Sequence, residues 1–240
     1  MKFSTRQVVV AGLLGSLTVA LGLMPVGGFI PVPTPAGSAT TMHLPTILAG
    51  ILEGPVVGGL VGAIFGAFSF YRAQVQPNPI AKLIFSNPLI AFGPRILIGV
   101  AAYWAFQVAE RRWGRVFLAL AGGGVLGYTA YWASFRIGGM DAAAGPWRAA
   151  LAAIVGLSVA WGLWVIGGRQ KGGAPLAALV GTMTNTVGVL GLAVAFGYVP
   201  LPAALAVAVL HGIPEALVAM VLVTLVHSGV QAATPSRARS

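Results

Sequence analysis

The stretch LEGPVVGGLVGAIFGAFSF, residues 52–70, contains a break between two helices followed by one long apolar run. Proline suits the first turn of a helix and disrupts a helix interior, so the sequence predicts that a new helix begins at Pro55. No charged residue follows until Arg72. A run of this length and polarity is typical of a helix that crosses a bilayer, which needs roughly 17–25 residues.

The whole chain has the composition of a polytopic membrane protein. Of its 240 residues, 58% are hydrophobic and 8% are charged, and the mean hydropathy is +0.90, values far from those of a soluble domain. The absence of cysteine excludes disulfides and thiolate nucleophiles. The excess of 14 basic over four acidic residues indicates membrane topology rather than nucleic-acid binding, because no basic stripe is interleaved with aromatic residues.

Apolar runs between polar or Gly/Pro breaks predict an all-α integral membrane protein with about eight transmembrane helices. The first run is longer than a signal-peptide core, so we expect it to remain as an uncleaved helix. The predicted spans cover residues 7–27, 40–52, 55–71, 87–109, 115–135, 147–166, 175–198 and 201–225.

The positions of the basic residues predict that both termini are cytoplasmic. With this orientation nine basic residues fall in inner segments and four in outer segments, as the positive-inside rule favours. A seven-span alternative would place one charged terminus on the wrong side.

A polar face interrupts the apolar run of the seventh span. Thr182, Asn185 and Thr186 follow one another at helical spacings of three and four residues, so they share one face. Hydroxyl and amide groups on one face suit a polar solute. A hydrogen bond between helices is the alternative and remains open here.

Two ionisable residues, Arg95 and Glu215, lie inside predicted spans. A charge in a bilayer is costly, so each is expected to face the bundle interior, a cavity or a partner. Binding of a solute by Arg95 and a structural Arg95–Glu215 ion pair both remain open.

The segment TTMHLP, residues 40–45, places two hydroxyls, Met42 and His43 at the outer end of the second span. The preceding loop FIPVPTPAGSA is expected to be a mobile cover. His43 and His211 have no carboxylate or cysteine partner at a recognised metal spacing, so we expect no metal. Phosphate-loop and nucleophile-elbow motifs are also missing, and neither enzymatic activity nor a cofactor is expected.

Small residues recur on the first span, where they allow another helix to approach closely. They are Ala11, Gly12, Gly15, Ser16 and Ala20. From these residues alone, ordinary packing within the bundle is the favoured explanation of such a face.

Four blocks together resemble a known family. They are TTMHLPTILAGILEGPVVGGLVGAIFGAFSF, NPLIAFGPRILIG, GTMTNTVGVLG and GIPEA. In this order they resemble the substrate-binding membrane subunits, or S components, of energy-coupling factor (ECF) vitamin importers, and most of all the pantothenate branch.

The resemblance implies a six-helix core that binds a vitamin near the outer face of a prokaryotic plasma membrane. The partners it implies are one transmembrane coupling subunit and two ATPase subunits, with uptake driven by ATP hydrolysis in the partners. It also implies that the small-residue face of the first span docks on the coupling subunit. Pantothenate is the first expected substrate, with hydroxymethylpyrimidine, folate or another vitamin behind it.

The matching blocks divide the chain into a core, residues 7–109 and 175–228, and an inserted helical hairpin, residues 115–168. Two inserted spans return the chain to the same side and keep the orientation of the core. We expect one membrane domain over residues 1–228 and a cytoplasmic tail over residues 229–240.

The second, third, fourth and seventh spans bring one set of side chains towards the outer half of the bundle. This predicted substrate-binding set is Thr41, Met42, His43, Phe70, Arg95, Thr182, Asn185 and Thr186. The competing functions are a stand-alone secondary transporter or facilitator and a structural membrane protein without a ligand.

Overall fold

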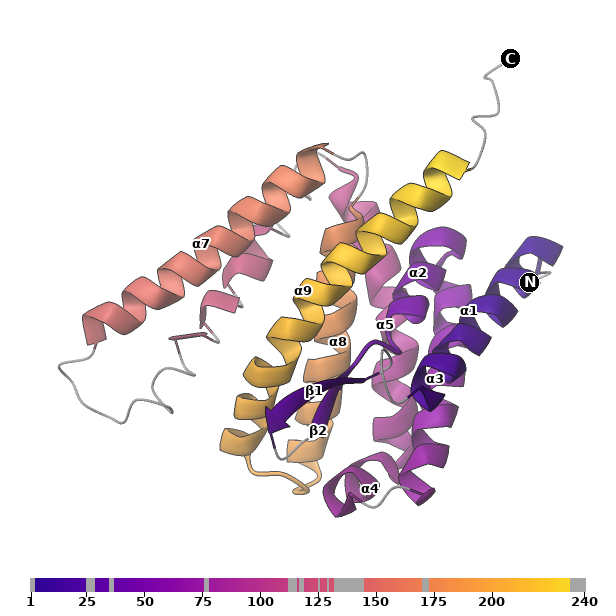
Figure 1. The fold of residues 1–240 in the computed structure, drawn as a ribbon, viewed down its shortest axis with the longest axis horizontal. Helices are drawn as coiled ribbons and strands as arrows, with labels where there is room; N and C mark the ends of the chain where they lie inside the picture. The colour runs from indigo at the N-terminus through magenta and orange to yellow at the C-terminus, as the bar shows by residue number, and fades with distance from the viewer. Residues whose placement is uncertain are drawn as a thin grey trace.

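The computed structural model describes residues 3–24, 29–34, 37–75, 78–111, 116, 119–124, 126–128, 130–131, 145–169 and 173–233. Helices dominate these residues, which confirms the predicted helical class (Figure 1). Six helices form the main bundle: α1 (Thr5–Leu23), α2 (Leu44–Glu53), α3 (Pro55–Val75), α5 (Pro88–Ala109), α8 (Ala174–Ala195) and α9 (Leu201–Ala233). α5 packs on both α3 and α8, and α9 packs on α8.

Five of the helices, α1, α3, α5, α8 and α9, are long and apolar enough to cross a membrane. α2 has ten residues, which rise only about 15 Å and do not cross a bilayer alone. α2 also begins at Leu44, four residues after the predicted start of the second span. α9 has 33 residues and continues eight residues beyond its predicted end.

The predicted break between α2 and α3 is confirmed. Gly54 ends α2 with a φ of +94°, a left-handed conformation that favours glycine, and α3 begins at Pro55. The chain reverses within this single residue, so α2 and α3 pack side by side.

Glycines let α2, α3 and α5 approach closely. A Cβ on Gly58 would lie 2.8 Å from the Cα of Gly50 and 2.9 Å from the Cα of Gly99. A Cβ on Gly62 would collide with the carbonyl oxygen of Arg95. This glycine seam fixes the position of α5, and with it the position of Arg95.

The segment predicted as a loop after the first span contains an antiparallel hairpin of β1 (Phe29–Thr34) and β2 (Gly37–Thr40). The prediction missed it because proline at 31 and 33 argues against a strand. Proline is nevertheless tolerated at a sheet edge, and both strands of a two-stranded sheet are edges. A further short helix, α4 (Pro79–Phe85), lies between α3 and α5.

The segment predicted as an insertion contains α7 (Gly145–Arg169), which packs on α8 at one side of the bundle (Figure 1). Helical residues 119–124 and 126–128 meet α7 through small residues, since a Cβ on Gly127 would lie 3.2 Å from the Cα of Gly156. Much of the first predicted inserted span, residues 115–135, lies outside the described residues, as do residues 234–240 of the predicted tail.

Contacts between helix ends define two ends of the bundle. At the N-terminal end, Arg6 pairs with Glu53 at 2.6 Å and the amide of Gly173 donates to Glu110 at 3.1 Å. At the opposite end, Asn87 donates to the hydroxyl of Tyr198 at 3.3 Å. The β hairpin and α4 lie at this second end (Figure 1), which we call the hairpin end.

Candidate functional site

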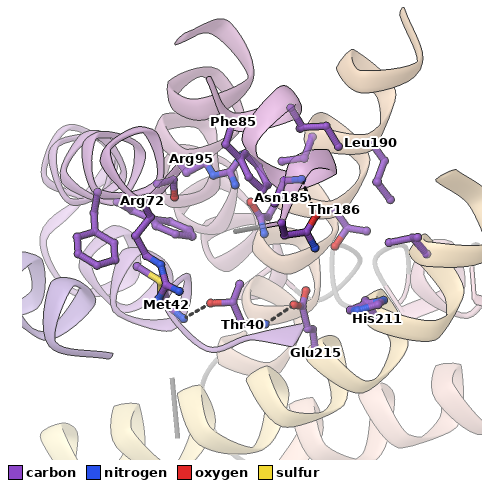
Figure 2. Close-up of a pocket in the computed structure, with 18 of the residues that line it drawn as sticks. Thr40, Met42, Arg72, Phe85, Arg95, Asn185, Thr186, Leu190, His211 and Glu215 are labelled. Atoms are coloured by element: carbon purple, nitrogen blue, oxygen red, sulfur yellow. Dashed lines mark hydrogen bonds between the residues drawn. The ribbon is translucent and has the colours of Figure 1, made fainter. Parts of the chain in front are cut away.

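A cavity of about 520 Å³ opens between the hairpin, α3, α4, α5, α8 and α9 in the hairpin half of the bundle. This volume lies within the usual range for sites that bind small molecules. Figure 2 shows polar side chains of β2, α3, α5, α8 and α9 around this cavity. The polar residues in its wall are Thr40, Ser69, Arg72, Asn78, Arg95, Asn185, Thr186, His211 and Glu215.

Arg95 is the most deeply buried cation of the cavity wall, with 4% of its surface exposed. Its Nη1 donates to the carbonyl of Ile90 at 2.8 Å. The guanidinium lies 4.6 Å from the ring centre of Phe85 and 5.3 Å from that of Phe65, distances at which a cation is attracted to an aromatic face. Its Nε has no hydrogen-bond partner, so the side chain is held in place with a donor to spare.

Asn185 and Thr186 bring the polar face of α8 to the same cavity. Both are buried, at 6% and 8% exposure. The Oδ1 atom of Asn185 is buried without a hydrogen-bond partner. A buried amide oxygen without a partner is costly, which indicates that a ligand or a water satisfies it.

Glu215 reaches the cavity from α9, one helical turn after His211. Its Oε1 accepts a 2.6 Å hydrogen bond from the amide of Thr40 at the end of β2. Within the part of the chain that the structure describes, no ion pair within 4 Å joins Arg95 to Glu215. Arg95 and Glu215 therefore border one cavity without forming a direct pair.

Apolar side chains make the rest of the wall. Met42, Phe65, Phe68 and Ile84 are each less than 10% exposed, and Val189 is 8% exposed. Arg72, in the last turn of α3, adds a second cation and donates to the carbonyl of Gly22 at 2.6 Å. A largely apolar wall with few polar groups is typical of small-molecule sites.

The structure brings four of the eight predicted substrate-binding residues to the cavity wall: Met42, Arg95, Asn185 and Thr186. The Nε2 of His43 and the Oγ1 of Thr182 lie 3.0 Å apart and bond α2 to α8, outside the wall. Thr41 is buried beside Met42, and Phe70 packs against Phe92 with ring centres 6.3 Å apart.

The sequence did not assign seven further residues of the wall to the site: Thr40, Phe65, Phe68, Arg72, Phe85, His211 and Glu215. Glu215 gives a signal as a charge inside a predicted span, which indicates a position in the bundle interior, at a cavity or against a partner but does not assign it to the substrate site. The phenylalanines gave none, because aromatic residues are common throughout a membrane chain.

The predicted docking residues of α1 point in two directions. Gly15 is buried, and a Cβ there would lie 2.5 Å from a methyl group of Ile64 on α3. Ala11 and Ala20 are partly buried. Gly12 and Ser16 are exposed, and a Cβ on Gly12 would meet nothing within 4 Å.

The described residues contain no group of three or more His, Asp or Glu side chains that could hold a metal ion. The cavity wall offers cationic donors on α3 and α5, an amide on α8 and a carboxylate on α9.

Comparison with protein families gives one match over nearly the whole chain. Residues 6–227 match the family described as "ECF transporter, substrate-specific component".

Two curated relatives are similar over part of their length. The pantothenate transporter PanT of Leuconostoc mesenteroides is 33% identical over 95 residues, which cover 40% of this chain and 45% of the relative. The pantothenic acid transporter PanT of Lactococcus lactis is 32% identical over 96 residues, 35% of this chain and 49% of the relative. The match thus spans about half the length of these relatives.

Proposed function

Because this chain belongs to the family of ECF transporter substrate-specific components, we propose that it captures a small water-soluble vitamin for uptake by partner subunits. The family consists of transporter components rather than enzymes, and the chain is a multi-pass protein of the cell membrane. Pantothenate is the first candidate substrate, since both relatives are named for its transport.

The observation that carries this proposal is the pair of buried polar atoms at the cavity wall. The Nε of Arg95 is a donor and the Oδ1 of Asn185 is an acceptor, and neither has a partner. A carboxylate would satisfy the first atom and an amide or hydroxyl donor the second. Pantothenate offers a carboxylate, an amide and two hydroxyls.

The surrounding wall supplies apolar surface for a small ligand. Phe65 and Phe85 face the Arg95 guanidinium, and Met42 and Phe68 add apolar surface. Apolar surroundings strengthen a charge-assisted hydrogen bond, because water competes less for the charge.

We place the hairpin end on the outer side of the membrane and both termini in the cytoplasm. The N-terminal end of the bundle then carries the cytoplasmic excess of basic residues. The cavity faces the outside, as capture of an external solute requires. The core over 7–109 and 175–228 belongs to the same proposal, as do the eight apolar segments, of which α2 does not cross the bilayer alone.

The proposed partners are one transmembrane coupling subunit and two ATPase subunits, because the chain itself carries no phosphate-loop motif. We propose that the exposed small residues Gly12 and Ser16 of α1 contact the coupling subunit. A surface without bulk allows close contact between helices, which stabilises association in a membrane.

Uptake of radiolabelled pantothenate into proteoliposomes tests this function. The chain alone should bind the vitamin and leave the lumen empty, and accumulation should appear only when the coupling and ATPase subunits are added with ATP. Pantothenate uptake by the chain alone would contradict the proposal. Uptake driven by an ion gradient would identify a secondary transporter, and uptake down the concentration gradient of pantothenate would identify a facilitator.

A further inference from the structure

Glu215 has no assigned part in substrate capture, yet its side chain lies in the cavity wall on α9. It is 7% exposed. Its Oε1 accepts a hydrogen bond from the backbone amide of Thr40. A carboxylate accepts as many as about four hydrogen bonds and donates none, so this group retains capacity to accept more.

Arg95 and Glu215 enter the cavity from different helices. Figure 2 shows Asn185 between the two, with Arg95 beside Phe85 and Glu215 beside Thr40. They form no direct ion pair within 4 Å. The cavity therefore offers a ligand a cation on one side and a hydrogen-bond acceptor on another, with an amide between them.

We propose that Glu215 is a specificity-determining residue that accepts a hydrogen bond from a hydroxyl group of the substrate, at the end remote from the carboxylate held by Arg95. This inference rests on the proposed function and narrows the substrate class to a monocarboxylate with a hydroxylated far end. The same carboxylate repels a second anionic group, so it discriminates against diacids.

Three ligands separate the two ends of the substrate. Pantothenate carries both the carboxylate and the hydroxyls. Panthenol replaces the carboxylate by an alcohol and keeps the hydroxyls. N-(3,3-dimethylbutanoyl)-β-alanine keeps the carboxylate and replaces both hydroxyls by hydrogen. Each is titrated against purified wild-type protein and variants, directly or by competition with radiolabelled pantothenate.

Glu215→Gln is the main variant, because the glutamine oxygen can still accept the Thr40 amide and hold the hairpin. It should weaken binding of pantothenate and panthenol by a similar factor of about ten or more, since hydrogen bonds to a charged acceptor are the stronger ones. Binding of the analogue without hydroxyls should stay within about twofold of wild type, where no such hydrogen bond is made.

Arg95→Gln should give the complementary pattern, weakening both carboxylates and sparing panthenol. Glu53→Gln is the matched control, since this carboxylate pairs with Arg6 at the opposite end of the bundle; it should leave all three affinities unchanged. Thermal unfolding of each variant reports whether the fold is intact.

An equal loss for all three ligands in Glu215→Gln would overturn the inference, because the carboxylate would then act on Arg95 or the hairpin rather than on the substrate. Unchanged binding of all three would overturn it as well. In both results the wild type still binds pantothenate, and the proposed function stands. A folded wild type that binds no pantothenate would instead contradict the proposed function, and the inference with it.

Discussion

At the scale of single residues, the binding chemistry of the cavity depends on a few buried polar atoms that lack hydrogen-bond partners. Asn185 differs from its neighbour Thr184, whose hydroxyl donates to the carbonyl of Val180 in its own helix at 2.8 Å. The hydroxyl of Thr184 is satisfied within α8, whereas the amide oxygen of Asn185 remains without a partner at the cavity wall.

Asn185→Ala should weaken pantothenate binding by about tenfold or more, because a polar group of the bound ligand would lose its partner at a cost of ~1–3 kcal/mol. Thr184→Ala on the same helix is the control and should bind normally. Titration calorimetry measures both. Unchanged affinity of Asn185→Ala together with a lowered unfolding temperature would contradict this role and indicate that Asn185 forms a hydrogen bond between helices instead.

At the residue scale, the sequence singles out side chains whose chemistry stands out against an apolar background. Asn185, Thr186 and Arg95 are such residues, and the structure places all three in the cavity wall. It could not separate them from Thr182, which shares their helical face but lies against His43. Helical spacing gives the direction of a side chain and not the neighbour that meets it.

At the scale of elements, the close packing of α3 and α5 decides where the site lies. The backbone carbonyl of Arg95 on α5 lies against Gly62 of α3, and the side chain of the same residue lines the cavity. A change of spacing between these helices therefore moves the cation as well as the backbone.

Gly62→Ala should lower the free energy of unfolding by ~1–3 kcal/mol or more, because the added methyl group overlaps the Arg95 carbonyl oxygen. Gly59→Ala is the matched control on the same helix, where a Cβ meets nothing closer than 3.7 Å. Thermal unfolding in detergent compares them. Equal melting temperatures for Gly62→Ala and wild type would contradict this and show that α3 and α5 can accommodate an added methyl group without loss of stability.

Gly12→Leu and Ser16→Leu should block assembly with the coupling subunit and leave vitamin binding intact, because both positions are exposed on α1 and far from the cavity wall. Gly191→Leu serves as the control, since Gly191 is open on α8. Co-purification with the coupling subunit measures assembly. Normal assembly of both α1 variants would place the docking surface elsewhere.

Among the elements, helix boundaries marked by proline were predictable and the hairpin was not. Pro55 begins a helix as the sequence indicated. The hairpin residues carry prolines and glycine, which indicate a loop from local chemistry alone. Pairing of β1 with β2 and the contact of Thr40 with Glu215 join residues far apart in the chain, beyond any local pattern.

At the scale of the whole molecule, composition predicted the helical membrane class, whereas the number of complete spans does not follow from hydropathy. α2 is apolar like its neighbours but has only ten residues. It is nevertheless buried along most of its length, so its apolar character reflects packing inside the bundle and not contact with lipid.

The proposed orientation predicts the location of three loops. Reporter fusions after Gly114 and Gly173 should report the cytoplasm, and a fusion after Gly197, in the turn between α8 and α9, should report the outside. The reason is the excess of basic residues at the N-terminal end of the bundle. An external signal at Gly114 or Gly173 would contradict the topology.

Native mass spectrometry tests the central claim, that the cavity between Arg95 and Asn185 selects a vitamin. Purified protein is incubated with an equimolar mixture of water-soluble vitamins, and wild type is compared with Asn185→Ala and Arg95→Gln. We expect one added mass on the wild type, that of pantothenate, and a smaller bound fraction on both variants. A wild type that retains no vitamin, or variants that retain as much as the wild type, would contradict it.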